Sequence, residues 1–296
     1  MKVILAASDL SPRSDRAVVQ AAYLAARMEA RLVLLNVVDD ELPAPIFDEE
    51  RGLALRALES TAARLDTLPR DRIDMRVSGG LDFREILAAA REEEADLIVL
   101  GAHRRAILED ILVGTTVERV VRNASTPILV VKRPGPGDYR CTLAALDLTA
   151  EAVSILEQAH GLAGGQTLYA LHVADDSVGL RQLGDAAAAD RHRAELARTC
   201  EGLLRGIARR AGLAPNGFLP VVERGSPAQA ILDAAGAFGA DLGVVGTRTR
   251  TRGPMERLLL GSVAERLLLD MPCDVLTVPL EGPTPLEGAG AVPMPG

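Results

Sequence analysis

The sequence predicts an α/β protein built from two similar domains, each with a parallel, doubly wound sheet. Two observations predict this fold class. Short apolar runs rich in valine, isoleucine and leucine alternate with stretches of helical period, as expected where strands alternate with helices. The same alternation then occurs a second time within the 296 residues, a length sufficient for two domains of ordinary size.

The first half predicts five strands and four helices. The run KVILAASD indicates a buried strand, and Ser11 and Pro12 begin a helix as its N-cap and first helical residue. Asp82, with Glu85 three positions later, is a variant of the capping box and starts the third helix. The predicted strands cover residues 2–9, 31–40, 73–77, 97–100 and 128–131, and the predicted helices cover residues 13–30 and 49–68 and segments that start at 82 and 114.

A proline- and glycine-rich segment, RPGPGD at residues 133–138, then interrupts the pattern, because it continues neither a strand nor a helix. After it the first half is echoed in matched order. LAALDLTAE echoes LAASDLSPR, YALHVADD echoes LLNVVDD, ADLGVVGTRTR echoes ADLIVLGAHRR, and LGSVAERLL echoes VGTTVERVV. We therefore expect a first domain at 1–133, a linker at 134–139, a duplicated second domain at 140–280 and a disordered tail at 281–296.

The composition argues against several classes of protein. A net charge of −8 and a pI near 5.2 argue against a nucleic-acid-binding protein, because neutralising phosphates requires a basic face. No apolar run reaches the roughly 20 residues of a membrane-spanning helix, and the first residues lead into a strand rather than a signal peptide. The 3 cysteines are scattered and form no CxxC pair, so we expect a reduced, cytoplasmic protein.

The sequence holds no pattern typical of catalysis or of a metal site. Lys2 and Lys132, the lysines of the chain, stand outside any GxxxxGK[ST] motif, which argues against Walker-type phosphate binding. The histidines show no ligand spacing with one another or with the cysteines, and no Ser-His-Asp or GxSxG pattern suggests hydrolysis. We therefore expect no catalytic residues and no protein-held metal.

One stretch of the first half is suited to binding an anion. Gly101 ends a predicted strand, and Gly114, Thr115 and Thr116 open the helix that follows the next loop. Unpaired backbone N–H groups and two hydroxyls at such a helix start favour phosphate. In the structural alternative, the glycines only relieve tight turns and a threonine only caps the helix.

These residues resemble the nucleotide-binding motif of the universal stress protein family, G-x2-G-x9-G-[ST], and the resemblance covers nearly the whole chain as a tandem two-domain member. Gly101, Gly114 and Thr115 stand at the family spacing, and Asp9 and Val37 match the family's residues at the ends of strands one and two. The second motif glycine is replaced by Arg104, which either supplies a cation to the phosphates or fills the pocket. The resemblance implies Rossmann-like domains with five strands in the order 3-2-1-4-5.

The second half departs from the motif differently. Its glycines stand two residues further apart than Gly101 and Gly114 do, so the intervening loop is longer. We expect nucleotide binding here to be weaker than in the first half. The matching second-half residues are Asp147, Val173, Gly246, Gly261 and Ser262.

The resemblance implies a cytoplasmic stress-response regulatory protein that binds an adenine nucleotide, ATP, with adenine near Asp9 and Val37. The pair Asp39 and Asp40 could help hold Mg²⁺ near the phosphates, or be an ordinary solvated pair. The family's dimer contact is made by the fifth strands, so segments 128–131 and 275–278 are expected to pair in an internal pseudo-dimer. Homodimerisation of the chain and an unidentified protein partner stay open.

Two other functions are compatible with the sequence. In the first, the protein is a nucleotide-free adaptor, with Arg104 occupying the first pocket and the longer loop closing the second. In the second, SGGLD at residues 78–82 is the pyrophosphate loop of an ATP pyrophosphatase-like enzyme. That loop follows the first strand in those enzymes but the third predicted strand here, and its second-half counterpart, ERGSP, keeps one glycine.

Overall fold

A computed structural model of the chain describes residues 1–102, 115–174, 186–248 and 261–280. Within these ranges the chain forms two compact units. The first comprises Met1–Gly137 and Cys273–Pro279, and the second comprises Asp138–Arg250, Gly261–Pro272 and Leu280. Each unit is described by itself below.

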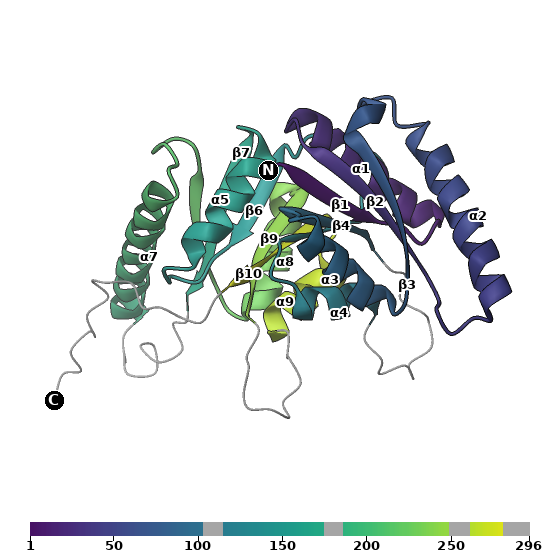
Figure 1. Ribbon diagram of the computed structural model, residues 1–296. Helices are drawn as coiled ribbons and strands as arrows, with labels where there is room; N and C mark the ends of the chain where they lie inside the picture. The colour runs from purple at the N-terminus through teal and green to yellow at the C-terminus, as the bar shows by residue number, and fades with distance from the viewer. Residues whose placement is uncertain (103–114, 175–185, 249–260, 281–296) are drawn as a thin grey trace. The chain divides into compact units, whose positions relative to one another are not determined.

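The first half alternates strands with helices, as predicted (Figure 1). Its elements are β1 (Val3–Ala7), α1 (Pro12–Arg27), β2 (Arg31–Val38), α2 (Ala44–Ala62), the 3-10 turn η1 (Arg70–Arg72), β3 (Ile73–Gly79), α3 (Asp82–Glu92), β4 (Leu97–Gly101), α4 (Thr116–Asn123) and β5 (Ile128–Val131).

These five strands run parallel in the order β3-β2-β1-β4-β5, which confirms the predicted order 3-2-1-4-5. Ala6 of β1 lies opposite Leu34 of β2 on one side and Val99 of β4 on the other. The strand order reverses between β1 and β4, so the loops after these strands diverge and leave a crevice at the carboxyl edge of the sheet. Ligands bind at this edge in such folds.

Helix α1 begins where the sequence predicts. Ser11 is the N-cap, its hydroxyl accepts a hydrogen bond from the backbone N–H of Ser14, and Pro12 opens the helix. The helix ends at Arg27, three residues before the predicted end, because Glu29 adopts a φ of 54° that no α-helix continues through. Its buried alanine-, valine- and leucine-rich face packs on β1 and β4.

One predicted helix start and one predicted helix cap are wrong. Helix α2 begins at Ala44 rather than near residue 49, because a proline at position 45 is tolerated in the first turn. Helix α3 has Leu81 as its N-cap, without a side-chain capping bond, so Asp82 is its first helical residue and not the cap. Asp82 Oδ1 accepts a hydrogen bond from the backbone N–H of Phe83 at 2.6 Å, and Oδ2 is left for other contacts.

The second half repeats the first, with four parallel strands in the order β8-β7-β6-β9. The fold class predicted from the sequence is thereby confirmed: both halves are Rossmann-like α/β domains. The described elements of this half are β6 (Cys141–Ala145), α5 (Ala152–Ala163), β7 (Thr167–Ala174), α7 (Ala186–Arg210), β8 (Leu219–Arg224), α8 (Pro227–Phe238), β9 (Leu242–Arg248), α9 (Ser262–Asp270) and β10 (Asp274–Leu280).

Strand β10 comes last in the chain, yet most of it belongs to the first unit. It pairs antiparallel with β5, with Val275 opposite Val130 and Thr277 opposite Ile128. Asp274, only 1% exposed, accepts hydrogen bonds from the backbone N–H groups of Lys132 and Arg133. The expected pairing of segments 128–131 and 275–278 is thus present within this unit.

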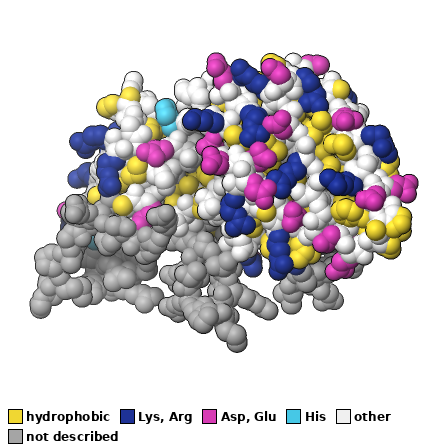
Figure 2. Space-filling view, in the orientation of Figure 1, with side chains coloured by type: hydrophobic (Ala, Val, Ile, Leu, Met, Phe, Trp, Pro, Cys, Tyr) yellow, Lys and Arg dark blue, Asp and Glu magenta, His cyan; other side chains and the backbone are white. Residues whose placement is uncertain are grey.

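The buried residues are mainly alanine, leucine, valine and isoleucine, in keeping with an aromatic content of 2%. On the face shown in Figure 2, the described acidic and basic side chains are interspersed. None of the described helices combines the length and the apolar character needed to cross a bilayer.

Candidate functional site

A cavity of about 340 Å³ opens at the carboxyl edge of the first sheet. Its walls come from the ends of β1, β2 and β4 and from the starts of α1, α3 and α4. Four of the residues singled out from the sequence line it: Asp9, Val37, Gly101 and Thr116. The fold therefore gathers five segments of the chain around one space.

The backbone around Asp9 is fixed by short-range hydrogen bonds. Asp9 Oδ1 accepts from the backbone N–H of Ser11 at 3.0 Å, and Ser8 Oγ accepts from that of Leu10 at 3.1 Å. Leu10 adopts a φ of 61°, which is uncommon for a residue other than glycine. Partial burial acts to raise the pKa of Asp9, but hydrogen bonds from Ser11 and Ser14 outweigh it, so the pKa lies below its usual 3.8. Asp9 therefore offers an ionised acceptor to the cavity.

Gly101 lies where the end of β4 meets the start of α1. A Cβ at this position would lie 3.0 Å from the carbonyl oxygen of Arg13 and 3.2 Å from Cα of Ser14. These are backbone atoms, which side-chain rotation cannot move away. The glycine therefore has a packing role as well as a place in the cavity wall.

The two threonines at the start of α4 have different roles. Thr115 is the N-cap of α4, and its Oγ1 accepts from the backbone N–H of Glu118 at 3.3 Å. Thr116 lines the cavity, and its hydroxyl donates a hydrogen bond to the Asp82 carboxylate. Thr115 thus matches the capping alternative, whereas Thr116 faces the cavity. Arg104 and Gly114 lie outside the described residues.

Sequence reasoning missed several polar residues of this cavity. The run SDLS at positions 8–11 and the SGGLD run were available signals, because both place polar groups at strand ends. The missed lining residues are Ser8, Ser11, Arg13, Ser14 and Asp82.

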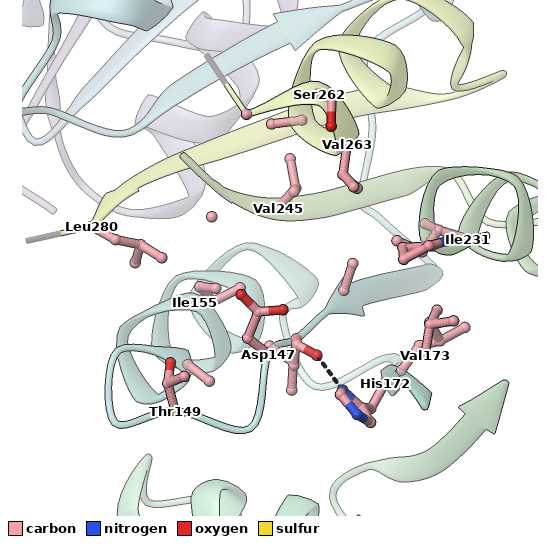
Figure 3. A pocket seen from close by; sticks show the side chains of 18 residues that line it. Asp147, Thr149, Ile155, His172, Val173, Ile231, Val245, Ser262, Val263 and Leu280 are labelled. Carbon is pink, nitrogen blue, oxygen red and sulfur yellow. Dashed lines mark hydrogen bonds between the residues drawn. The ribbon is translucent and has the colours of Figure 1, made fainter. Parts of the chain in front are cut away.

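A second cavity of about 290 Å³ lies at the equivalent edge of the second unit (Figure 3). All five second-half candidates line it: Asp147, Val173, Gly246, Gly261 and Ser262. Ile155 and Leu280 also line it, and a Cβ at Gly246 would lie 2.9 Å and 2.5 Å from their Cδ1 atoms. The wall of this cavity near Gly246 is therefore apolar.

Comparison with known proteins identifies the family to which this two-cavity chain belongs. The profile of the universal stress protein family matches residues 1–132 and again residues 138–279. The chain belongs to the universal stress protein family. Because the profile matches twice, the chain is a tandem member with two family domains.

Relatives of this stress protein are found among archaea and bacteria. Universal stress protein MJ0531 of Methanocaldococcus jannaschii is 32% identical over 145 residues, which are 45% of this chain and 83% of that protein. A universal stress protein of Thermus aquaticus is 33% identical over 137 residues, which are 44% of this chain and 98% of that protein. Each of these matches pairs most of a relative with less than half of this chain, as expected for a duplicated protein.

A solved structure shares the fold of the whole tandem protein. The crystal structure of a universal stress protein from Archaeoglobus fulgidus has a TM-score of 0.67 with 22% identity. The match covers 94% of this chain and 98% of that chain.

In this stress protein, both glycines of the SGGLD run have structural reasons. A Cβ at Gly79 would lie 2.6 Å from Cζ of Phe47, so the position is closed by an aromatic ring from α2. Gly80 has a φ of 142°, and its second-half counterpart Gly225 a φ of 104°, both in the region that favours glycine. Among the described residues, no group of three or more His, Cys, Asp or Glu side chains is placed to hold a metal ion.

In both halves of this stress protein a side chain contacts the backbone carbonyl oxygen at the equivalent position, but the side chain differs. Asn36 Nδ2 donates to the carbonyl oxygen of Ser8 at 2.8 Å in the first half. In the second half, His172 Nδ1 lies 2.9 Å from the carbonyl oxygen of Leu146 (Figure 3). A carbonyl oxygen only accepts, so Nδ1 is the donor of this hydrogen bond.

Proposed function

We propose that this stress protein binds an adenine nucleotide, ATP, at the first cavity, and that it acts as a regulatory protein. The observation that carries the proposal is the convergence of Asp9, Val37, Gly101 and Thr116 on one cavity. Its volume of about 340 Å³ lies within the range of roughly 300–1,000 Å³ typical of small-molecule sites.

In this proposal each part of the ligand meets a matching group. Adenine lies near Val37 and Asp9, and the Asp9 carboxylate accepts hydrogen bonds from the nucleoside. The phosphates lie at the start of α4, where the helix dipole and unpaired N–H groups favour an anion. Thr116 adds a hydroxyl donor. Gly114 belongs to the motif, and in this proposal Arg104, which replaces the second motif glycine, supplies a cation to the phosphates. Mg²⁺ enters with the nucleotide.

The second cavity is proposed as a second nucleotide site, weaker than the first. Nucleotide binding regulates only if the bound state has a different affinity for a protein partner or a different arrangement of the chain. We place the protein in the cytoplasm, with the duplicated domains serving as an internal pseudo-dimer.

The test is a calorimetric titration of the nucleotide-depleted protein with MgATP. We expect at least one binding site. Asp9→Ala should weaken MgATP binding at the first cavity by about tenfold or more, because about 1.4 kcal/mol of lost hydrogen bonding corresponds to a tenfold change in affinity. Asp147→Ala is the matched control, because the duplication places the same residue in the other cavity. Absence of binding at millimolar MgATP would reject the proposal and favour the nucleotide-free adaptor.

A further inference from the structure

Asp82 places a negative charge inside the first cavity. It is the first residue of α3, its side chain lines the cavity, and its carboxylate accepts a hydrogen bond from the hydroxyl of Thr116 at the start of α4. The carboxylate thereby engages the same hydroxyl that is proposed to face the phosphates.

The second half lacks this charge. Pro227 is the first residue of α8 and the counterpart of Asp82, since SGGLD aligns with ERGSP in the duplication. Pro227 lines the second cavity, and its side chain has neither a charge nor a polar atom. In both halves, the helix that follows the third strand therefore contributes its first residue to the cavity, but only the first half contributes an anion.

The described walls of the first cavity hold two carboxylates, whereas those of the second hold one, Asp147. Asp9, Arg13 and Asp82 are the charged side chains among the described lining residues of the first cavity. Bringing a ligand of several negative charges beside two carboxylates costs Coulombic energy that a neutral ligand does not meet. A ligand phosphate must also replace the Asp82 carboxylate at the Thr116 hydroxyl.

We propose that Asp82 is a specificity-determining residue of the first site. Its carboxylate competes with ligand phosphates for the Thr116 hydroxyl, and its negative charge lowers affinity more for ligands that carry more negative charge. The inference rests on the nucleotide site proposed above and adds its selectivity. The first cavity then favours nucleosides and nucleotides of low charge over uncomplexed ATP. Mg²⁺ bound to ATP reduces the penalty by neutralising part of the ligand charge.

The test compares Asp82→Asn with wild type across a series of ligands of increasing charge: adenosine, AMP and ATP, each titrated calorimetrically in EDTA. Asn keeps the size of the side chain and removes its charge. We expect affinity to rise about tenfold for ATP, about two- to threefold for AMP and not at all for adenosine. Glu85→Gln is the matched control, because it removes one negative charge from the same first turn of α3 without lining the cavity, and it should leave all three affinities within about twofold.

A reciprocal variant keeps the test independent of how Asp82→Asn folds. Pro227→Asp introduces the charge into the second cavity. It should lower the affinity of that cavity for ATP and leave its affinity for adenosine unchanged. The inference is overturned if Asp82→Asn leaves ATP affinity unchanged, or raises ATP and adenosine affinity alike. It is also overturned if Asp82→Asn lowers the affinity for MgATP, because Asp82 would then help to hold the metal ion. Binding without the charge trend overturns this inference alone, whereas absence of all binding by wild type and variants overturns the nucleotide site as well.

Discussion

Thr142 is a fully buried threonine of β6 whose hydroxyl has no hydrogen-bond partner among the described residues. Its counterpart in the first half is Ile4, also fully buried, so the position is a core position that needs no polar group. We expect Thr142→Val to stabilise the protein by about 1 kcal/mol, because it removes an unpaired buried hydroxyl while keeping the shape.

Denaturant unfolding measures this change, and Thr277→Val is its control. Thr277 is equally buried, but its Oγ1 donates to the carbonyl oxygen of Ile128 at 3.4 Å. The same substitution should therefore cost about 1 kcal/mol there. Equal effects at the two positions would contradict the interpretation.

The residues of the site were predictable from the sequence only in part. Asp9, Val37, Gly101 and Thr116 follow from strand ends, helix starts and motif spacing. The contact between Asp82 and Thr116 does not, because it joins residues 34 positions apart across the starts of two helices. Local pattern instead assigned Asp82 to the helix cap, whereas Leu81 occupies the N-cap position of α3 and Asp82 Oδ1 accepts from the backbone N–H of Phe83.

At the scale of elements, a repeated aspartate ties the start of one strand to the start of its neighbour. Asp96, just before β4, accepts from the backbone N–H groups of Lys2 and Val3 at the start of β1. Asp241 does the same before β9, accepting from Arg140 at 2.8 Å and Cys141 at 3.0 Å. The ADL repeat in the sequence showed the residue, but its partner is visible only once the strand order is known.

This tie predicts a specific response to acid. Partial burial acts to raise the pKa of Asp96, but hydrogen bonds from Lys2 and Val3 outweigh it, so the folded-state pKa lies below the usual 3.8. The tie therefore stabilises the fold above about pH 4 and is lost as pH falls through the folded-state pKa. Asp96→Asn should be less stable than wild type at pH 7, and the difference should vanish near pH 2.

Urea unfolding across pH 2–7 tests this expectation, with Asp66→Asn as the control at an exposed aspartate. A constant difference between wild type and Asp96→Asn over the whole range would show that the charge of Asp96 is not the cause.

Whole-molecule organisation was visible in the sequence as a duplication, because matched motifs recur in matched order. The grouping of β10 with the first unit has no local signal, since Val275–Val278 reads like any apolar strand. It depends on antiparallel pairing with β5, a partner about 145 residues away in the chain, and local patterns carry no information on such pairings.

The pairing predicts how a shortened chain behaves. A fragment of residues 1–137 lacks β10 and leaves the apolar strand β5 as an open edge, which is a template for pairing with another chain. We expect this fragment to self-associate at micromolar concentration, as measured by light scattering after size exclusion.

Adding a peptide of residues 272–280 should suppress that association, because it restores the missing strand. A scrambled peptide of the same composition should have no effect. A fragment that stays monomeric without the peptide would contradict the expectation.

Asn36 and His172 show how the two duplicated domains keep the same contact with different residues. Both side chains serve a carbonyl oxygen at the same register, through an amide in one half and an imidazole in the other. The fold at this position therefore requires an N–H within reach of the carbonyl oxygen, and either residue supplies one. Comparing the two halves therefore shows which side chains can replace one another at this position within the same fold.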